Sequence, residues 1–236
     1  MTPQFFVVAR VVGSPGAFPK WEKRLVPLCD VSATEPQGTS YYWAQDLDGE
    51  PDTLWGLEGY SHAVGFFLGH PSSKIFKREM ALVDKDKLLK NVQGLGSPDY
   101  DLHHYDLAGG WLTLENDGDK YSRTSHVAVH HFWAKDGQRD DIIEKLIKFS
   151  EDVKNEQQTT PVCVQSCAVL KECVYKHGNL TTLWLRTKTR EDYTNLMSSA
   201  TWRTLQSNLQ GNIEKTEIHQ ARAFNGHIDQ PASFQG

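Results

Sequence analysis

The chain has 236 residues, of which 39% are hydrophobic and 23% charged; this composition supports a buried core and is too apolar for a disordered chain. A formal net charge of −5 argues against a surface that binds nucleic acid or an anionic membrane. No apolar run approaches the roughly 20 residues that span a bilayer, and residues 1–16 lack the basic flank and cleavage pattern of a signal peptide. We therefore expect a cytoplasmic protein without nucleic-acid or membrane partners.

The elements expected along the chain form one series twice. An apolar, β-branched run at residues 4–12 is followed by a helical periodicity, two strands joined by a turn, a second helix and a closing strand at 102–112. The series begins again at 125–133 and closes at 218–228. The two closing strands align best, because they share a histidine and a glycine at equivalent positions. The second helices are expected at residues 61–80, with a break at Gly-His-Pro 69–71, and at 189–209, where Thr189 and Asp192 form a capping-box pattern. Asp140 is the expected N-cap of the helix that follows the strand at 125–133.

This order, βαββαβ, is that of a ferredoxin-like unit. We assign the first repeat to residues 1–112, a polar, turn-rich linker to 113–124 and the second repeat to 125–236. Residues 5–8 show no polar alternation, so both faces of the first strand are expected to be buried. The sequence therefore predicts an α+β fold in which the sheets of the two repeats face each other in an intrachain barrel. Such a chain would be a monomer, or a homodimer formed through its outer surfaces.

The four cysteines predict neither a disulfide nor a zinc site. If Cys163 and Cys167 share a strand, they lie roughly 13 Å apart, too far for a bond between them. No CxxC pair is present. We interpret the cysteines as buried small hydrophobic residues, with a reactive thiol that lines a pocket as the alternative.

Four motifs of the first copy carry a family resemblance: 7–10 (VVAR), 35–38 (EPQG), 57–60 (LEGY) and 70–76 (HPSSKIF). In their order and spacing, residues 4–112 resemble the antibiotic-biosynthesis-monooxygenase family. The second copy resembles it only through the internal repeat. A tandem chain of this kind is similar to fungal tailoring enzymes of secondary metabolism.

The resemblance implies a dimeric α+β barrel fold and a broad range of functions. Members include cofactor-independent monooxygenases that convert phenols and anthrones to quinones, haem-degrading enzymes, and small isomerase-like proteins. The catalytic residues of these branches do not transfer. Gly56 and Tyr60 stand where quinone-forming members have an asparagine–tryptophan pair. The Asn, Trp and His of haem-degrading members are replaced by Ala9, His70 and Met80 in the first copy and by His130, Ser199 and Leu209 in the second.

The histidines are the strongest candidates for catalysis, because a neutral imidazole is a suitable base near pH 7. His130 is the leading candidate, at a strand position that the resemblance places toward the barrel interior, where the first copy has Ala9. His126 lies on the same face. We expect one productive pocket that reaches from this strand to the first copy's second helix, where His70 lies. The remaining candidate groups are His104 and Tyr60.

The other candidates are expected to bind substrate rather than to react. Aromatic residues are predicted to form the wall of the pocket: Tyr41, Trp43, Trp55, Phe67 and Phe132. Glu58 is predicted to be a hydrogen-bonding group. For each residue, a purely structural role in the core is the alternative. No histidine pair has the i, i+4 helical spacing with a carboxylate that is typical of a metal site, and no phosphate-binding loop is present, so we expect no metal and no cofactor.

The first functional hypothesis is a cofactor-independent monooxygenase that oxidises a polycyclic phenol or anthrone with O₂, in aromatic polyketide-type secondary metabolism. An electron-rich substrate anion could reduce O₂ directly. The second hypothesis keeps the hydrophobic aromatic substrate and replaces oxidation by proton transfer, as in a cyclase, dehydratase, decarboxylase or isomerase. The third is a non-catalytic protein that binds a small molecule.

Overall fold

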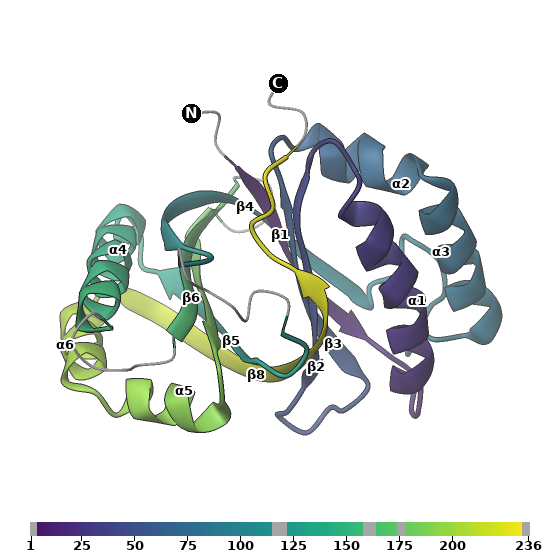
Figure 1. Cartoon of the computed structure of the whole chain (residues 1–236). Helices are drawn as coiled ribbons and strands as arrows, with labels where there is room; N and C mark the ends of the chain where they lie inside the picture. Colours follow the sequence, from purple (N-terminus) through teal and green to yellow (C-terminus); the bar gives the residue numbers. More distant parts are fainter. Residues whose placement is uncertain (1–3, 115–121, 158–163, 174–177, 233–236) are drawn as a thin grey trace. The chain divides into compact units, whose positions relative to one another are not determined.

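The computed structural model describes residues 4–114, 122–157, 164–173 and 178–232. Within these ranges it has eight strands, six α-helices and one π-helical turn, in an α+β fold (Figure 1). The chain divides into two compact units, and each is described by itself. The first unit comprises residues 1–104, 121–123 and 221–236; the second comprises 105–120 and 124–220.

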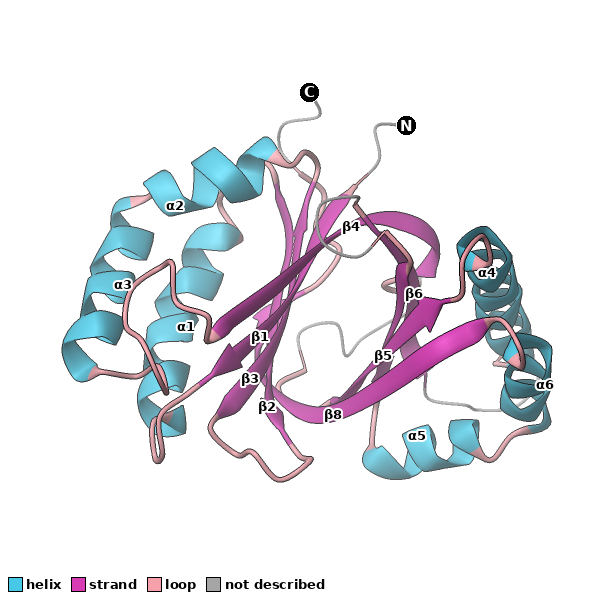
Figure 2. Cartoon of the chain, turned by 180° about the vertical axis from the view of Figure 1, so that it is seen from behind, coloured by secondary structure: helices cyan, strands magenta, loops and turns pink. Residues whose placement is uncertain are grey.

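The first unit is a sheet with helices on one face (Figure 2). Strand β3 (Thr53–Tyr60) pairs antiparallel with β1 (Phe5–Val12) on one side and with β2 (Gly38–Asp46) on the other. The helical segments are α1 (Phe18–Ser32), the π-helical turn η1 (Gly65–Gly69), α2 (His70–Ser72) and α3 (Lys74–Asp86). A break in the second helix is present, but it lies at Ser73 and not at residues 69–71 as predicted. Ser73 has extended backbone angles, and its hydroxyl begins α3 by accepting a hydrogen bond from the Phe76 amide, whereas η1 continues directly into α2.

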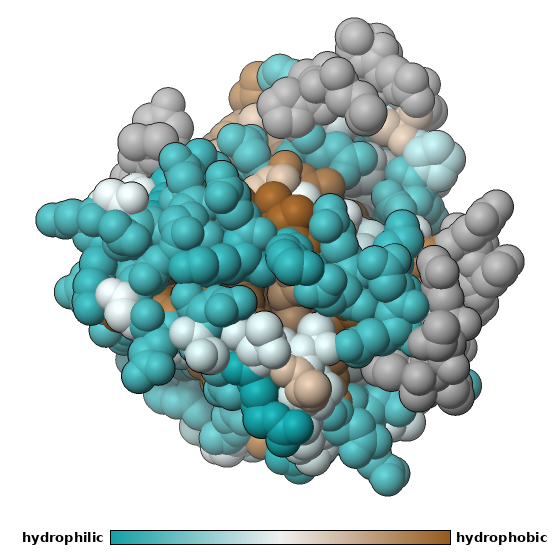
Figure 3. Space-filling model, turned by 90° about the vertical axis from the view of Figure 1, so that its left-hand side faces the viewer, coloured by the Kyte–Doolittle hydropathy of each residue, from teal (hydrophilic) through white to brown (hydrophobic). Residues whose placement is uncertain are grey.

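The second unit repeats the arrangement. Strand β7 (Leu180–Thr187) pairs with β5 (His126–Ala134) and with β6 (Val164–Glu172). Helices α4 (Arg139–Glu156), α5 (Arg190–Met197) and α6 (Ala200–Leu209) lie over the sheet. Figure 3 shows the side on which α4 and α6 lie, and hydrophilic side chains dominate it.

Two helix predictions in this unit need correction. Asp140 lies in the first turn of α4, and Gln138 is the residue that precedes the helix. The single helix expected at 189–209 is two helices, because Ser199 begins α6 by accepting a hydrogen bond from the Trp202 amide. The capping box that begins α5 at Thr189 is confirmed.

The closing strands are exchanged between the units. Strand β8 (Ile213–His227) ends in the first unit, where its last residues pair with β2. Strand β4 (Tyr100–Trp111) ends in the second unit, where its last residues pair with β6. The hydrogen-bonded order β1-β3-β2-β8-β5-β7-β6-β4 is that of a closed barrel. The α+β class and the barrel connectivity are thus confirmed. That the sheets of the two repeats face each other stays a prediction.

The apolar pattern of the first strand has the predicted consequence: residues 5–8 are all buried. In the first unit, β1 and β2 pack against Trp21, Leu25 and Leu28 of α1. Among the described residues, no helix has both the length and the apolar character needed to cross a membrane. Cys29 and Cys167 are buried and free, and burial raises the pKa of Cys29 to about 11; Cys163 lies outside the described residues.

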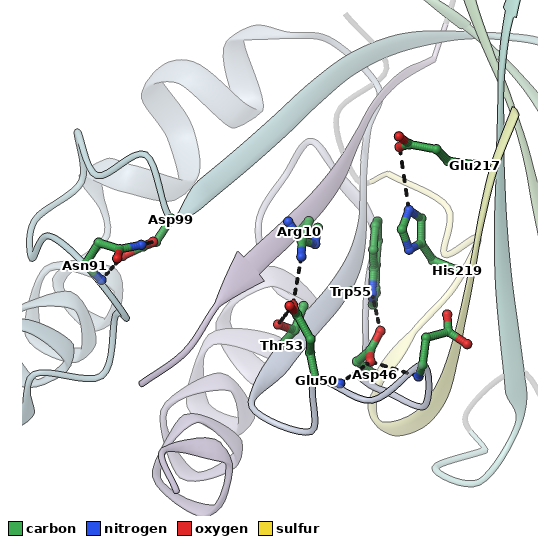
Figure 4. A network of polar contacts seen from close by, with 10 residues as sticks. Arg10, Asp46, Glu50, Thr53, Trp55, Asn91, Asp99, Glu217 and His219 are labelled. Carbon is green, nitrogen blue, oxygen red and sulfur yellow. Dashed lines mark hydrogen bonds and ion pairs between the residues drawn. The ribbon is translucent and has the colours of Figure 1, made fainter. Parts of the chain in front are cut away.

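The turn between β2 and β3 is organised by the carboxylate of Asp46 (Figure 4). It accepts hydrogen bonds from the amides of Asp48 and Glu50 and from the indole N–H of Trp55. The guanidinium of Arg10 pairs with Glu50 at 2.8 Å and lies 6.0 Å from the Trp55 ring. These contacts fix Trp55 at the turn.

Candidate functional site

A cavity of about 240 Å³ lies between the sheet and the helices of the first unit. Ala9, Tyr41 and Trp43 border it from the strands, and residues of α1 and α3 close it with apolar side chains. Glu58 and His70 line it as well, and their carboxyl and imidazole groups are of the kinds used in general acid–base catalysis. The cavity is thus an apolar, aromatic chamber that contains two proton-transfer groups.

His70 is held by a carboxylate. Its Nδ1 lies 2.9 and 3.0 Å from the two carboxylate oxygens of Glu35, a residue in the connection between α1 and β2. An ionised carboxylate can only accept, so Nδ1 carries the hydrogen. In the neutral imidazole, Nε2 therefore has the free lone pair. Nε2 is buried and has no hydrogen-bond partner within the part of the chain that the structure describes.

The ring of His70 is also fixed by packing. It is 2% exposed and lies 5.2 Å from the ring of Tyr41 and 5.1 Å from that of Phe76, between ring centroids. Side-chain orientation is thus set by both a hydrogen bond and aromatic contacts. Such restraint is what a catalytic base requires.

Strand β3 carries a second pair of acid–base groups, Glu58 and Tyr60. The hydroxyl of Tyr60 donates a hydrogen bond to Oε2 of Glu58 at 2.8 Å. Burial raises the pKa of Glu58 above its ordinary value, while the neighbouring His70 and the bond from Tyr60 act in the opposite direction. Burial also raises the pKa of Tyr60 and of Tyr41 well above the usual range. Both phenols therefore stay protonated, and Glu58 holds its proton to a higher pH than an exposed carboxyl.

Gly56 makes room for the aromatic wall. A Cβ atom at this position would lie 2.8 Å from the six-membered ring of Trp43. Trp43 and Gly56 are directly paired across β2 and β3, so the indole lies over the glycine. The residue that replaces a family asparagine thus has a steric role here.

The first unit contains a histidine that sequence reasoning missed. His227 is paired with Tyr41 across β8 and β2, so the two side chains share one face. It is buried, and burial lowers its pKa to about 4. Glu35 was also missed as a site residue, although it lies in one of the motifs that carry the resemblance. For His227 no local signal existed, because it belongs to the closing strand of the other repeat.

The second unit has a different cavity, of about 460 Å³. His130 lines it together with Phe132 and Trp202. The Nε2 atom of His130 lies 3.1 Å from the Tyr193 hydroxyl of α5, and its ring lies 5.3 Å from that of Trp202 on α6. His126 lies on the same face, 5.0 Å from the Tyr193 ring. This face packs against helices, so the prediction that it points into the barrel interior is wrong.

Burial changes the chemistry of these two histidines. It lowers the pKa of His130 to about 3 and that of His126 to about 4. The His130 cavity is lined by residues of the second unit and the His70 cavity by residues of the first. The prediction of one pocket that joins His130 to His70 is therefore wrong.

Of the remaining candidates, one lines the first cavity and two do not. Phe67 lines the first cavity. His104 lies beside η1, with its ring 5.3 to 5.7 Å from those of Phe5, Phe66 and Phe67. Trp55 lies on the opposite face of the sheet from Trp43. Among the described residues, no group of three or more His, Cys, Asp or Glu side chains could hold a metal ion.

No protein-family model and no curated protein matches the sequence. Solved structures share its fold. A candidate monooxygenase from Fusobacterium nucleatum is 10% identical, with a TM-score of 0.77 and coverage of 100% of this chain and 99% of that one. A candidate monooxygenase from Lactobacillus acidophilus is 8% identical, with a TM-score of 0.75 and coverage of 96% and 97%. An anthrone oxidase-like protein is 10% identical, with a TM-score of 0.66 and coverage of 100% and 96%. At these identities the likeness shows the fold.

Proposed function

We propose that the protein is a cofactor-independent monooxygenase that oxidises a compact polycyclic phenol or anthrone in the cavity of the first unit. The observation that carries this proposal is the pair formed by Glu35 and His70 at the wall of an apolar chamber. The resemblance to the antibiotic-biosynthesis monooxygenases and the names of the similar structures agree with it.

The first chemical step is removal of a proton from the substrate. Nε2 of His70 accepts it, and the Glu35 carboxylate stabilises the imidazolium that forms. The surrounding aromatic side chains keep water away from the resulting anion. The same side chains, Tyr41 and Trp43 among them, offer flat surfaces against which a fused ring system can stack.

The second step is reaction of the anion with O₂. The carbanion of an anthrone CH₂ group adds O₂ to give a peroxide, which takes back the proton held by His70. His70 then removes the remaining C–H proton while the O–O bond breaks and Glu58 protonates the departing oxygen; the proton on His70 restores Glu58, and the products are a carbonyl and water. The carbon loses four electrons and O₂ gains four, so no external reductant is needed. Glu58, with its raised pKa, is placed to protonate the departing oxygen.

The cavity limits the size of the reacting group. Its volume of about 240 Å³ is below the ~300–1,000 Å³ of most pockets for drug-sized ligands. We therefore expect a compact fused-ring portion of the substrate to enter it. Together the walls and the volume exclude a strongly charged or branched ligand.

Proton transfer without oxidation is the second candidate function. It is favoured by the presence of two proton-transfer groups, His70 and Glu58, in one cavity. Isomerisation or dehydration needs a base at one substrate atom and an acid at another. A non-catalytic binding protein would use the same apolar walls.

The test uses anthrone as the probe, with O₂ uptake and quinone formation measured together. We expect the wild-type protein to consume one O₂ for each quinone formed and to lose activity in H70F, while the exposed His62→Phe variant keeps it. Product formation that continues unchanged under nitrogen would establish the non-oxidative function. Anthrone recovered unaltered after binding would indicate the binding protein.

A further inference from the structure

The mouth of the first cavity is bordered by exposed apolar side chains. Phe67 is 55% and Leu95 is 62% exposed, and both line the cavity. Leu68, the next residue after Phe67, is 67% exposed, and Val92, three residues before Leu95, is 51% exposed; neither lines the cavity. We call Phe67 and Leu95 the apolar rim.

The position of Phe67 is fixed by contacts with three other rings. Its ring lies 5.9 Å from that of Phe5, 5.1 Å from that of Phe66 and 5.4 Å from that of His104. It stands on η1, a π-helical turn of the kind that often marks functional sites. A Cβ atom at Gly65 would lie 2.7 Å from the Tyr60 ring, so the glycine lets this turn approach the sheet closely.

Leu95 is presented by a loop that a buried carboxylate organises. Asp99 accepts hydrogen bonds of 2.6 Å from the backbone amide and from the side-chain amide of Asn91 (Figure 4), and one of 3.2 Å from the amide of Val92. The amide of Gly94 donates to Asp84 at 2.8 Å. The loop therefore holds Leu95 at the mouth at a fixed place.

Two fixed hydrophobic side chains that face water are costly in the free protein, because covering apolar surface stabilises by about 25 cal/mol per Å². The cavity behind them holds only a compact group. Resting on the proposed function, we propose that the substrate has two parts. A compact phenolic ring system enters the cavity and lies near His70, and an apolar substituent, an alkyl chain or a further ring, lies across Phe67 and Leu95.

The test is a series of 4-alkyl-1-naphthols, from methyl to hexyl, titrated calorimetrically into the full chain. We expect affinity to rise by about threefold to fourfold for each methylene group that reaches the rim. In the double variant F67S/L95S this increase per methylene falls to less than half, so the loss of affinity is larger for the hexyl than for the methyl compound. The matched variant L68S/V92S removes two equally exposed side chains beside the rim and should keep the wild-type increase.

Three outcomes overturn the proposal: an equal increase per methylene in both double variants, no increase in the wild type, or no binding of any member of the series. An equal loss of affinity for all members in F67S/L95S also overturns it, because the rim would then only support the cavity. The proposed oxidation is tested separately by O₂ uptake. Binding with the expected increase but without turnover would support the two-part ligand and contradict the proposed monooxygenase activity.

Discussion

Each unit has a buried histidine, and the two are held by different partners. In the first unit, His70 is held by the carboxylate of Glu35; in the second, His130 is held by the neutral hydroxyl of Tyr193. A carboxylate stabilises the protonated imidazole, whereas a phenol in an apolar setting does not compensate the loss of hydration. The pKa of His130 accordingly falls to about 3. The same fold therefore gives one histidine whose protonated form has a carboxylate partner and one that stays neutral.

The largest expected effect separates these two histidines directly. Replacing His70 by Phe removes the proposed base, and turnover should fall by roughly 10²–10⁴-fold. The matched H130F variant should stay within a few-fold of wild type. The measurement is the initial rate with anthrone per folded molecule, with folding checked by circular dichroism. The reverse ranking, with H130F the less active variant, would move the active site to the second unit.

Removal of the charge of Glu35 is expected to have the next largest effect. In E35Q the imidazolium loses its carboxylate partner. A hydrogen bond to a charged group contributes about 1.5–3 kcal/mol, so kcat should fall by roughly 10–100-fold. Because a negative charge beside the imidazolium is lost, the pH at which activity is half-maximal should fall in the variant. A purely structural role would not move it. An unchanged pH profile together with a lower melting temperature would assign Glu35 to stability alone.

Each of the exchanged strands, β4 and β8, contains a glycine that lies close to the backbone of the strand it pairs with. Gly110 and Gly226 have φ of 80° and 146°, and a Cβ atom would lie 2.1 Å from the carbonyl oxygen of Cys167 and 2.6 Å from that of Tyr41. Substitution of either by Ala should lower the free energy of unfolding by about 1–3 kcal/mol. Gly49, at φ 106° with nothing within 4 Å, is the control: G49A carries only the backbone strain. Equal losses for all three, measured by urea unfolding, would show that the close approach contributes nothing.

The smallest expected effect concerns pH. Unfolded histidines bind protons near pH 6.5, but folded His130 does not until about pH 3. The unfolded state therefore takes up more protons as pH falls below 6.5, and stability is lost in that direction. From pH 6.5 to pH 5 this residue should cost about 1–2 kcal/mol. H130F should lose that much less over the same range, and an identical loss in both proteins would contradict the buried neutral state.

The sequence by itself determined the repeat, the strand and helix types, and the burial of residues 5–8. The strand and helix signals are local: the continuous apolar run at residues 5–8 and the capping box at Thr189 act over a few positions, so they can be read without knowing the fold. The family resemblance also indicated the barrel topology. Of the site, the sequence identified His70, Tyr60, Glu58 and the aromatic residues Tyr41, Trp43 and Phe67 as candidates.

Only the tertiary structure decided how these candidates are combined. The contact between Glu35 and His70 joins residues 35 positions apart, and no local pattern specifies such a pair. The exchange of β8 brings His227 beside Tyr41, although the two belong to different repeats. The sequence correctly predicted that His130 shares a face of its strand with His126 and Phe132. It did not predict that this face packs against the helices. Which face the helices cover is decided by the burial of apolar surface over the whole sheet. It is this packing that gives His130 a phenol as its partner, whereas His70 has a carboxylate.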